Sequence, residues 1–159
     1  MGVLSVVWRV HSSGLDDIKI VRHALDNLTG EGMESKEDVG RSWHGSPQVE
    51  FERRTRKKSK SRESLARMGT KALSGLMDED VSLRIDGNNI FHLRLSLADL
   101  CCGIVKITDP RRRLPCIKGE FKIEVYPGQD VLEVAKNVLQ RAYDQALRNN
   151  WNHSAIDTE

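Results

Sequence analysis

The chain has 159 residues, of which 38% are hydrophobic and 30% charged, and its formal net charge is +2 at pH 7. This length fits one domain that buries a core without disulfides or a structural metal. No stretch approaches the roughly 18 apolar residues of a membrane span, and residues 1–10 are too short for a signal-peptide core. We therefore expect a cytoplasmic protein without membrane contact, with a single domain over residues 1–149 and a polar C-terminal tail over residues 150–159.

The first half of the chain predicts two strands and two helices. Residues 3–10 are apolar and β-branched, as in a buried strand, and residues 18–28 repeat apolar side chains at helical spacing. Residues 31–38 are polar and acidic, which indicates a loop. In residues 48–55 polar and apolar side chains alternate, with Val49, Phe51 and Arg53 on one side, which predicts a half-buried strand. A glycine-weakened helical pattern runs from residue 61 to residue 76.

The second half adds a hairpin, further strands and a final helix. Residues 81–85 and 91–97 alternate on either side of an Asp-Gly-Asn-Asn turn, which predicts a β-hairpin. Residues 103–108 and 121–125 predict two more strands, and residues 131–146 predict an amphipathic helix with a capping-box start. The order of elements predicts an α+β fold, a largely antiparallel sheet with about three helices packed on one face.

The sequence lacks the motifs of metal sites and common enzymes. Cys101, Cys102 and Cys116 lack C-x-x-C spacing and fall in apolar, strand-like surroundings, which indicates buried, reduced thiols. The five histidines show no zinc-binding spacing, and no Walker A, G-x-S-x-G or dinucleotide-binding motif occurs. The acidic residues 78–80 would suit Mg²⁺, but acidic helix ends are far more common. We expect a protein that is not an enzyme and that holds neither a metal nor a cofactor.

The most distinctive feature is a cationic run over residues 53–62. Because the whole chain carries only +2, the remainder is net acidic and the positive charge is concentrated here. Blocks of like charge repel each other and are typical of interaction segments, so we expect a hairpin or loop that contacts RNA phosphates. A solvated loop, a nuclear-import signal or a segment that docks on an acidic partner subunit would have the same composition. The basic residues are Arg53, Arg54, Arg56, Lys57, Lys58, Lys60 and Arg62.

Two other segments are candidates for the same RNA surface. Trp43 and His44 lie in a turn just before the strand that leads into the cationic run. Trp43 would stack on an unpaired base and His44 would contact phosphate or base edges, or else the two would cover the core edge and hold the turn. Between Pro110 and Pro115 lies a basic loop, which is either a second phosphate contact or a solvated segment. Its basic residues are Arg111, Arg112 and Arg113.

Three short motifs are similar to those of a known family. They are Trp43-His44-Gly45-Ser46-Pro47, Phe91-His92-Leu93-Arg94-Leu95 followed by Gly103, and Tyr126-Pro127-Gly128 before the terminal helix. Over roughly residues 3–147 the chain resembles an archaeal family of predicted exosome subunits and RNA-binding proteins. Members often carry Asn in place of Ser46 and Asp-Lys-Gln in place of residues 96–98. We therefore transfer no functional role from the family to individual residues of the strand that ends there.

The resemblance implies a fold like that of a large-subunit ribosomal protein that contacts 5S RNA. It also implies a non-enzymatic RNA-binding protein, accessory to exosome-type RNA processing or attached to a ribosome-related complex. The alternative is a protein–protein adaptor whose basic segment docks on an acidic partner subunit.

Overall fold

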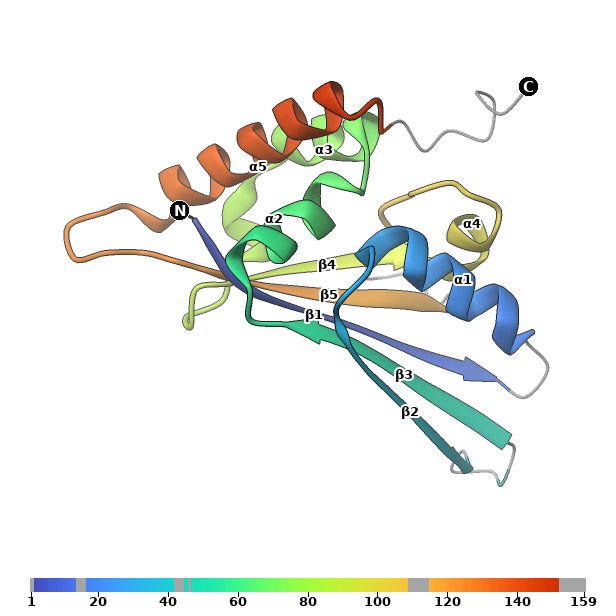
Figure 1. Cartoon of the computed structure of the whole chain (residues 1–159). Coiled ribbons are helices and arrows are strands. Elements are labelled where there is room, and N and C mark those ends of the chain that lie inside the picture. Colours follow the sequence, from blue (N-terminus) through green and yellow to red (C-terminus); the bar gives the residue numbers. More distant parts are fainter. Residues whose placement is uncertain (1, 14–16, 42–44, 46, 109–114, 152–159) are drawn as a thin grey trace.

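A computed structural model describes residues 2–13, 17–41, 45, 47–108 and 115–151 (Figure 1). Within these ranges five strands form one antiparallel sheet in the order β2-β3-β1-β5-β4. The first and last strands of this order, β2 and β4, are its edges. The strands are β1 (Val3–Ser13), β2 (Glu34–Arg41), β3 (Pro47–Thr55), β4 (Ile90–Ser96) and β5 (Cys116–Ile123).

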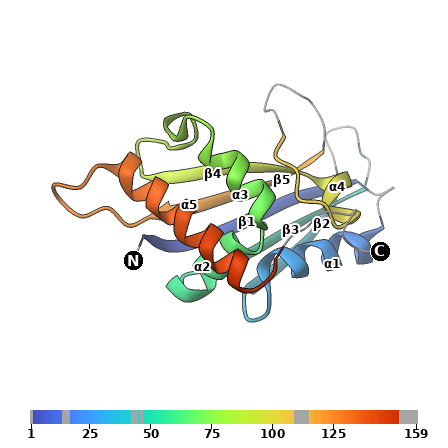
Figure 2. The same ribbon diagram turned by 90° about the horizontal axis from the view of Figure 1, so that it is seen from above.

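All helices of the described residues lie on one face of this sheet (Figures 1 and 2). No described helix covers the other face, which is here called the bare face. This arrangement confirms the predicted α+β class and the packing of helices on one side. The helices are α1 (Ile18–Thr29), α2 (Lys58–Ala66), α3 (Thr70–Met77), α4 (Leu97–Cys101), α5 (Val131–Arg148) and the 3-10 turn η1 (Val81–Arg84). In the described residues there are thus five α-helices, where about three were predicted.

The core lies between the sheet and the helices, and Trp8 of β1 is at its centre. Trp8 is fully buried, its indole N–H donates to Ser64 Oγ of α2 at 2.8 Å, and that hydroxyl donates to the Leu28 carbonyl of α1 at 3.1 Å. Its ring covers Gly119 of β5 so closely that a Cβ there would lie 2.4 Å from a ring carbon. One buried side chain therefore joins the sheet to α2 and, through Ser64, to α1.

One predicted element in the first half is wrong, and the glycine-weakened helix is broken in two. The expected acidic loop contains strand β2, which begins at Glu34 and pairs with β3 along its whole length. An exposed edge strand carries little apolar alternation, so the usual strand signal is missing. The single weak helical pattern is two helices, α2 and α3, separated at Gly69, whose φ of +91° lies in the region that favours glycine.

The predicted hairpin is also wrong in its first strand. Asp80 accepts hydrogen bonds from the Ser82 backbone N–H at 3.1 Å and from its hydroxyl at 2.6 Å, and η1 forms in place of a strand. Only an isolated bridge between Ile85 and Phe91 remains of the hairpin. Residues 103–108 likewise supply a single bridge, from Ile107 to Leu95, and not a strand.

The prediction that the cysteines are buried is wrong, since Cys101 and Cys116 are only partly buried. Cys116 begins β5, but Cys101 ends helix α4, and Cys102 is exposed.

In the expected tail, the Trp151 carbonyl accepts from the Thr70 N–H at 3.1 Å, and the guanidinium carbon of Arg67 lies 4.9 Å from the Trp151 ring centroid. Trp151, the last residue that the structure describes, therefore packs beside the start of α3.

Candidate nucleic-acid interface

The cationic run passes from the end of β3, through Arg56 and Lys57, into the first turns of α2. It is a strand–turn–helix segment of the domain and not the expected hairpin tip or loop. Arg53 faces inward, as the alternation of β3 predicted, and its side chain is only 11% exposed. Its guanidinium pairs with Asp26 of α1 at 2.9 Å, and Lys60 donates to the Glu31 carbonyl at 2.7 Å. Arg53 thus holds α1 against the sheet, and Lys60 holds the segment after α1 against α2.

Four other cations of the run gather at the β3–α2 junction and are here called the cationic turn. Arg54, on the bare face of the sheet, pairs with Glu52 at 3.0 Å, and Lys58 pairs with Glu124 at 3.1 Å. Arg56 and Lys57 are exposed, and neither forms an ion pair within the described residues. The cationic turn therefore presents two cations whose charge no carboxylate offsets. Its members are Arg54, Arg56, Lys57 and Lys58.

Helix α2 begins in the middle of this cationic turn. Its N-cap is Lys57, no side chain caps it, and its first turn holds no acidic residue. The first N–H groups of a helix have no partner inside the helix, and the helix dipole adds partial positive charge there. By contrast α1 and α5 begin at Asp17 and Asp130, whose carboxylates accept from the backbone. Positive charge thus accumulates at the start of α2, where an anion would be stabilised.

An exposed aromatic ring lies beside these cations. Tyr126, just after β5, is 51% exposed, and its hydroxyl donates to Glu124 Oε1 at 2.5 Å. Lys58 donates to the same oxygen, so Glu124 joins the ring to the cationic turn. The hydrogen bond from Tyr126, followed by that from Lys58, lowers the pKa of Glu124 and keeps this carboxylate charged. Cations that bind phosphate next to a ring that stacks on a base are typical of single-strand binding surfaces.

A groove of about 530 Å³ lies on the other side of the cationic turn. Residues of β2, of β3 and of the cationic turn line it, together with Gly32. The pKa of Glu52, at the rim of the adjoining hollow, is lowered by the hydrogen bond from Arg54 and by a second one from Arg9. The groove is lined by Gly32, Glu34, Arg54, Thr55, Arg56 and Lys57.

Trp43, His44 and the three arginines of residues 111–113 lie outside the described residues. The neighbouring residues that are described, Pro47 and Pro115, stand at the starts of β3 and β5. Pro47 is separated from Thr55, next to the cationic turn, by the length of β3, about 26 Å at 3.3 Å per residue. The structure therefore assembles the cationic turn without describing these other predicted contacts.

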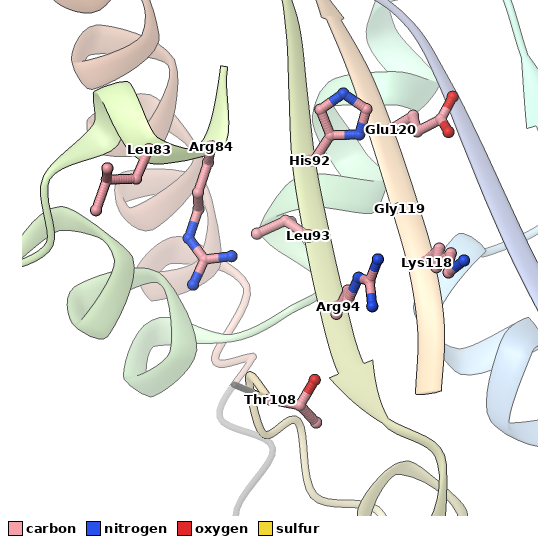
Figure 3. Close-up of a pocket in the computed structure, with 9 residues that line it drawn as sticks. All are labelled: Leu83, Arg84, His92, Leu93, Arg94, Thr108, Lys118, Gly119 and Glu120. Atoms are coloured by element: carbon pink, nitrogen blue, oxygen red, sulfur yellow. The ribbon is translucent and has the colours of Figure 1, made fainter. Parts of the chain in front are cut away.

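A second group of cations, which the sequence patterns did not single out, surrounds a groove of about 340 Å³ beside β4 (Figure 3). Arg94 of β4 and Lys118 of β5 are direct cross-strand partners on the bare face, and Arg84 of η1 lines the same groove from the other side of β4. His92 Nε2 lies 2.8 Å from Asp86 Oδ2, and this bond lowers the pKa of Asp86. The alternation of each strand predicts which residues face outward, but the pairing of Arg94 with Lys118 depends on strand register.

Two of the three acidic residues considered for Mg²⁺ have structural partners. Glu79 pairs with Arg84 at 2.8 Å and Asp80 caps η1. Among the described residues, no group of three or more His, Cys, Asp or Glu side chains is placed to hold a metal ion. Within the same part of the chain, no helix has the length and apolar character needed to span a membrane.

No protein-family model matches the chain, and no curated protein matches it in sequence. Solved structures of archaeal proteins share its fold. A DUF54 protein from Methanothermobacter thermautotrophicus is 23% identical with a TM-score of 0.71, over 90% of this chain and 99% of that one. A DUF54 protein from Archaeoglobus fulgidus is 19% identical with a TM-score of 0.70, over 86% and 99%.

A UPF0201 protein from Methanococcus jannaschii is more distant, at 18% identity and a TM-score of 0.56, over 86% of this chain and 99% of that chain. At these identities the likeness establishes the fold and nothing about ligands. The neighbours are archaeal, which agrees with the archaeal origin of the family that the sequence resembles. They supply no link to an exosome or a ribosome.

Proposed function

We propose that this protein is a non-enzymatic RNA-binding protein that contacts phosphates through the cationic turn, as an accessory of an exosome-type RNA-processing complex. The main support is the position of Arg56 and Lys57. Both are exposed and without an ion-pair partner in the described residues, and both lie at the uncapped start of α2. A phosphate placed there would offset the side-chain charges and accept from backbone N–H groups at the same time.

The surroundings of the turn favour a single strand over a duplex. Tyr126 offers a half-exposed ring beside Lys58, and base–aromatic stacking requires a base that is not enclosed in a helix. Arg54 and Lys58 are engaged by Glu52 and Glu124, and both are at least 42% exposed. Their carboxylate partners are only 17% and 11% exposed, so a phosphate would approach the exposed cations and share them with Glu52 and Glu124. The expected site thus has four cations and one stacking surface.

Filter binding of a single-stranded RNA over a range of salt concentrations tests this proposal. If four cations each neutralise one phosphate, log K should fall with log[salt] with a slope of about −3. Arg56→Gln/Lys57→Gln should make this slope shallower by about 1.4, at 0.7 per lost contact. The matched control is Lys71→Gln/Arg148→Gln, which removes the same charges from exposed positions of α3 and α5. Absence of RNA retention at low salt, or equal slopes for all three proteins, would refute the proposal.

The adaptor function predicts a different dependence on RNA. Partners that co-purify with the protein should be lost on nuclease treatment if RNA holds them. Partners that survive nuclease but are lost from Arg56→Gln/Lys57→Gln would indicate an acidic protein docked on the cationic turn. Incubation of labelled RNA with the protein and Mg²⁺ tests the non-enzymatic part of the proposal, for which no cleavage products are expected.

A further inference from the structure

The bare face of the sheet carries a row of three cations across three neighbouring strands. Arg9 of β1 pairs in register with Lys118 of β5, and Lys118 pairs with Arg94 of β4. Inward-facing neighbours of these residues, such as Trp8, Ile117 and Leu95, are fully buried, so the three cations project from the opposite, bare face. Figure 3 shows Arg94 and Lys118 side by side on this face.

This row opposes like charges at direct cross-strand positions, which destabilises a sheet. Arg9 is offset by Glu52 at 3.0 Å and by Glu120 at 3.3 Å. Lys118 and Arg94 form no ion pair with any residue that the structure describes. The protein therefore maintains an unfavourable pair of charges at a surface where opposite charges would fit equally well.

Positively and negatively charged side chains also predominate on different halves of the bare face. Over β1, β5 and β4 the outward positions hold four cations, Arg9, Arg94, Lys118 and Lys122, against the single carboxylate of Glu120. Over β2 and β3 the outward positions are richer in carboxylates than in cations. They are Glu34, Lys36, Asp38, Gln48, Glu50, Glu52 and Arg54. The cationic half is continuous with the groove beside β4, which Arg94 and Lys118 line together with Glu120 and with Arg84, whose charge Glu79 offsets.

The cationic turn and this row lie within reach of one strand of RNA. Arg54 is in register with Val7, two residues before Arg9 on β1. With strands about 4.8 Å apart and residues about 3.3 Å apart, Lys118 lies roughly 12 Å from Arg54 and Arg94 roughly 16 Å from it. Arg9 stands between them on this path.

We propose that an RNA strand bound at the cationic turn continues across the bare face of the sheet, where Lys118 and Arg94 neutralise its phosphates and the groove beside β4 receives its end. This inference rests on the RNA-binding function proposed above. It adds a second contact region and a direction to the bound strand, from the β3–α2 junction toward β4. The like charges of the row are then offset by phosphates in the complex.

An RNA backbone fits this surface better than a protein does. Energetic centres of protein interfaces are buried aromatic and aliphatic anchors. The large hydrophobic side chains that are highly exposed in the described residues all lie elsewhere: Ile20 on α1, Leu83 on η1, Leu147 on α5, Tyr126 after β5, and Val39 on the helix-side face of β2. A face with unpaired cations and no such anchor is typical of sequence-independent phosphate contact.

The experiment compares a 5′-phosphorylated dinucleotide with a twelve-nucleotide RNA on the wild type and on Arg94→Gln/Lys118→Gln. An unpaired strand can extend to about twice the helical rise of about 3.4 Å per nucleotide, so the two phosphates of the dinucleotide lie at most about 7 Å apart, which is too short to join the two regions. For the longer RNA the variant should have a salt slope shallower by about 1.4. Between 50 and 200 mM salt its affinity should therefore fall about sevenfold less than that of the wild type. For the shorter RNA the two proteins should match.

The fold of the variant is checked by thermal melting, in which loss of the opposed like charges should raise the Tm at low salt. Lys118→Glu provides a second variant, which gives Arg94 an opposite charge and should weaken binding of the longer RNA further. If the variants match the wild type on the longer RNA while Arg56→Gln/Lys57→Gln weakens it, the path across the sheet is wrong and the cationic turn stands. If the wild type binds neither RNA, both proposals fall. If the variants lose only binding to a polyglutamate peptide, the face is a protein-docking surface and the inference is wrong.

Discussion

Replacement of Gly119 by alanine should destabilise the domain through the ring of Trp8. The new Cβ would lie 2.4 Å from one ring carbon of Trp8 and 2.8 Å from two others, well inside any normal contact. The ring cannot move freely because its N–H donates to the buried Ser64 hydroxyl at 2.8 Å. Overpacking of a close-packed core costs about 1–3 kcal/mol, and strain on this buried hydrogen bond adds to it, so we expect a loss of about 2–3 kcal/mol.

At about 2–4 °C per kcal/mol for a domain of this size, the Tm of Gly119→Ala should fall by about 4–12 °C in differential scanning calorimetry. The matched control is Gly75→Ala in α3, where a Cβ meets nothing within 4 Å. Because alanine favours a helix over glycine, this control should gain up to about 1 kcal/mol. A Tm of Gly119→Ala within 1 °C of the wild type would refute the packing of Trp8 against β5.

Three further predictions concern single side chains. Ser64→Ala removes the acceptor of the Trp8 indole N–H in a fully buried site, so unfolding in urea should show a loss of about 1–3 kcal/mol; a loss below 0.5 kcal/mol would contradict the bond. Because the hydrogen bonds from Arg54 and Arg9 lower the pKa of Glu52, its stabilising effect is present above the pKa of a free Glu, about 4.3, and is lost as the pH falls through the lower folded value. The stability difference between the wild type and Glu52→Gln should therefore shrink on acidification, and a difference that grows would be inconsistent with this pairing. In Tyr126→Phe the pKa of Glu124 should rise toward its ordinary value because its largest stabilising hydrogen bond is gone, as an NMR titration of that carboxyl would measure; an unchanged pKa would rule out this contact.

Local sequence patterns predicted the strands and helices that have one buried side and one exposed side. The alternation of residues 48–55 placed Arg53 with Val49 and Phe51, and Arg53 is indeed buried among the inward residues of β3. Strand β2 escaped prediction because an exposed edge strand needs no apolar face. The segment at Val81 alternates like a strand, but the Asp80 cap favours a 3-10 turn, a competition that composition does not decide.

The candidate RNA-binding surface could be predicted only in part, because local sequence patterns do not contain long-range contacts. Consecutive basic residues identify the cationic turn, and the alternation of residues 48–55 sets Arg53 apart, but the ion pair of Arg53 with Asp26 is seen only in the structure. Arg94 and Lys118 are 24 positions apart and belong to different strands. Their meeting depends on the register between β4 and β5, which long-range packing sets and which neither local pattern contains.

The most direct measurement of the central claim is an NMR titration of the ¹⁵N-labelled protein with a short single-stranded RNA at low salt. The backbone N–H groups of Lys58, Ser59 and Lys60 form the first turn of α2, which no side chain caps, so a bound phosphate should accept from them. We predict that these three amide signals show the largest shifts in the spectrum, and that at equal RNA concentration the shifts are smaller in Arg56→Gln/Lys57→Gln because its affinity is lower. RNA binding that leaves these signals in place and shifts signals only on α3 and α5 would contradict it.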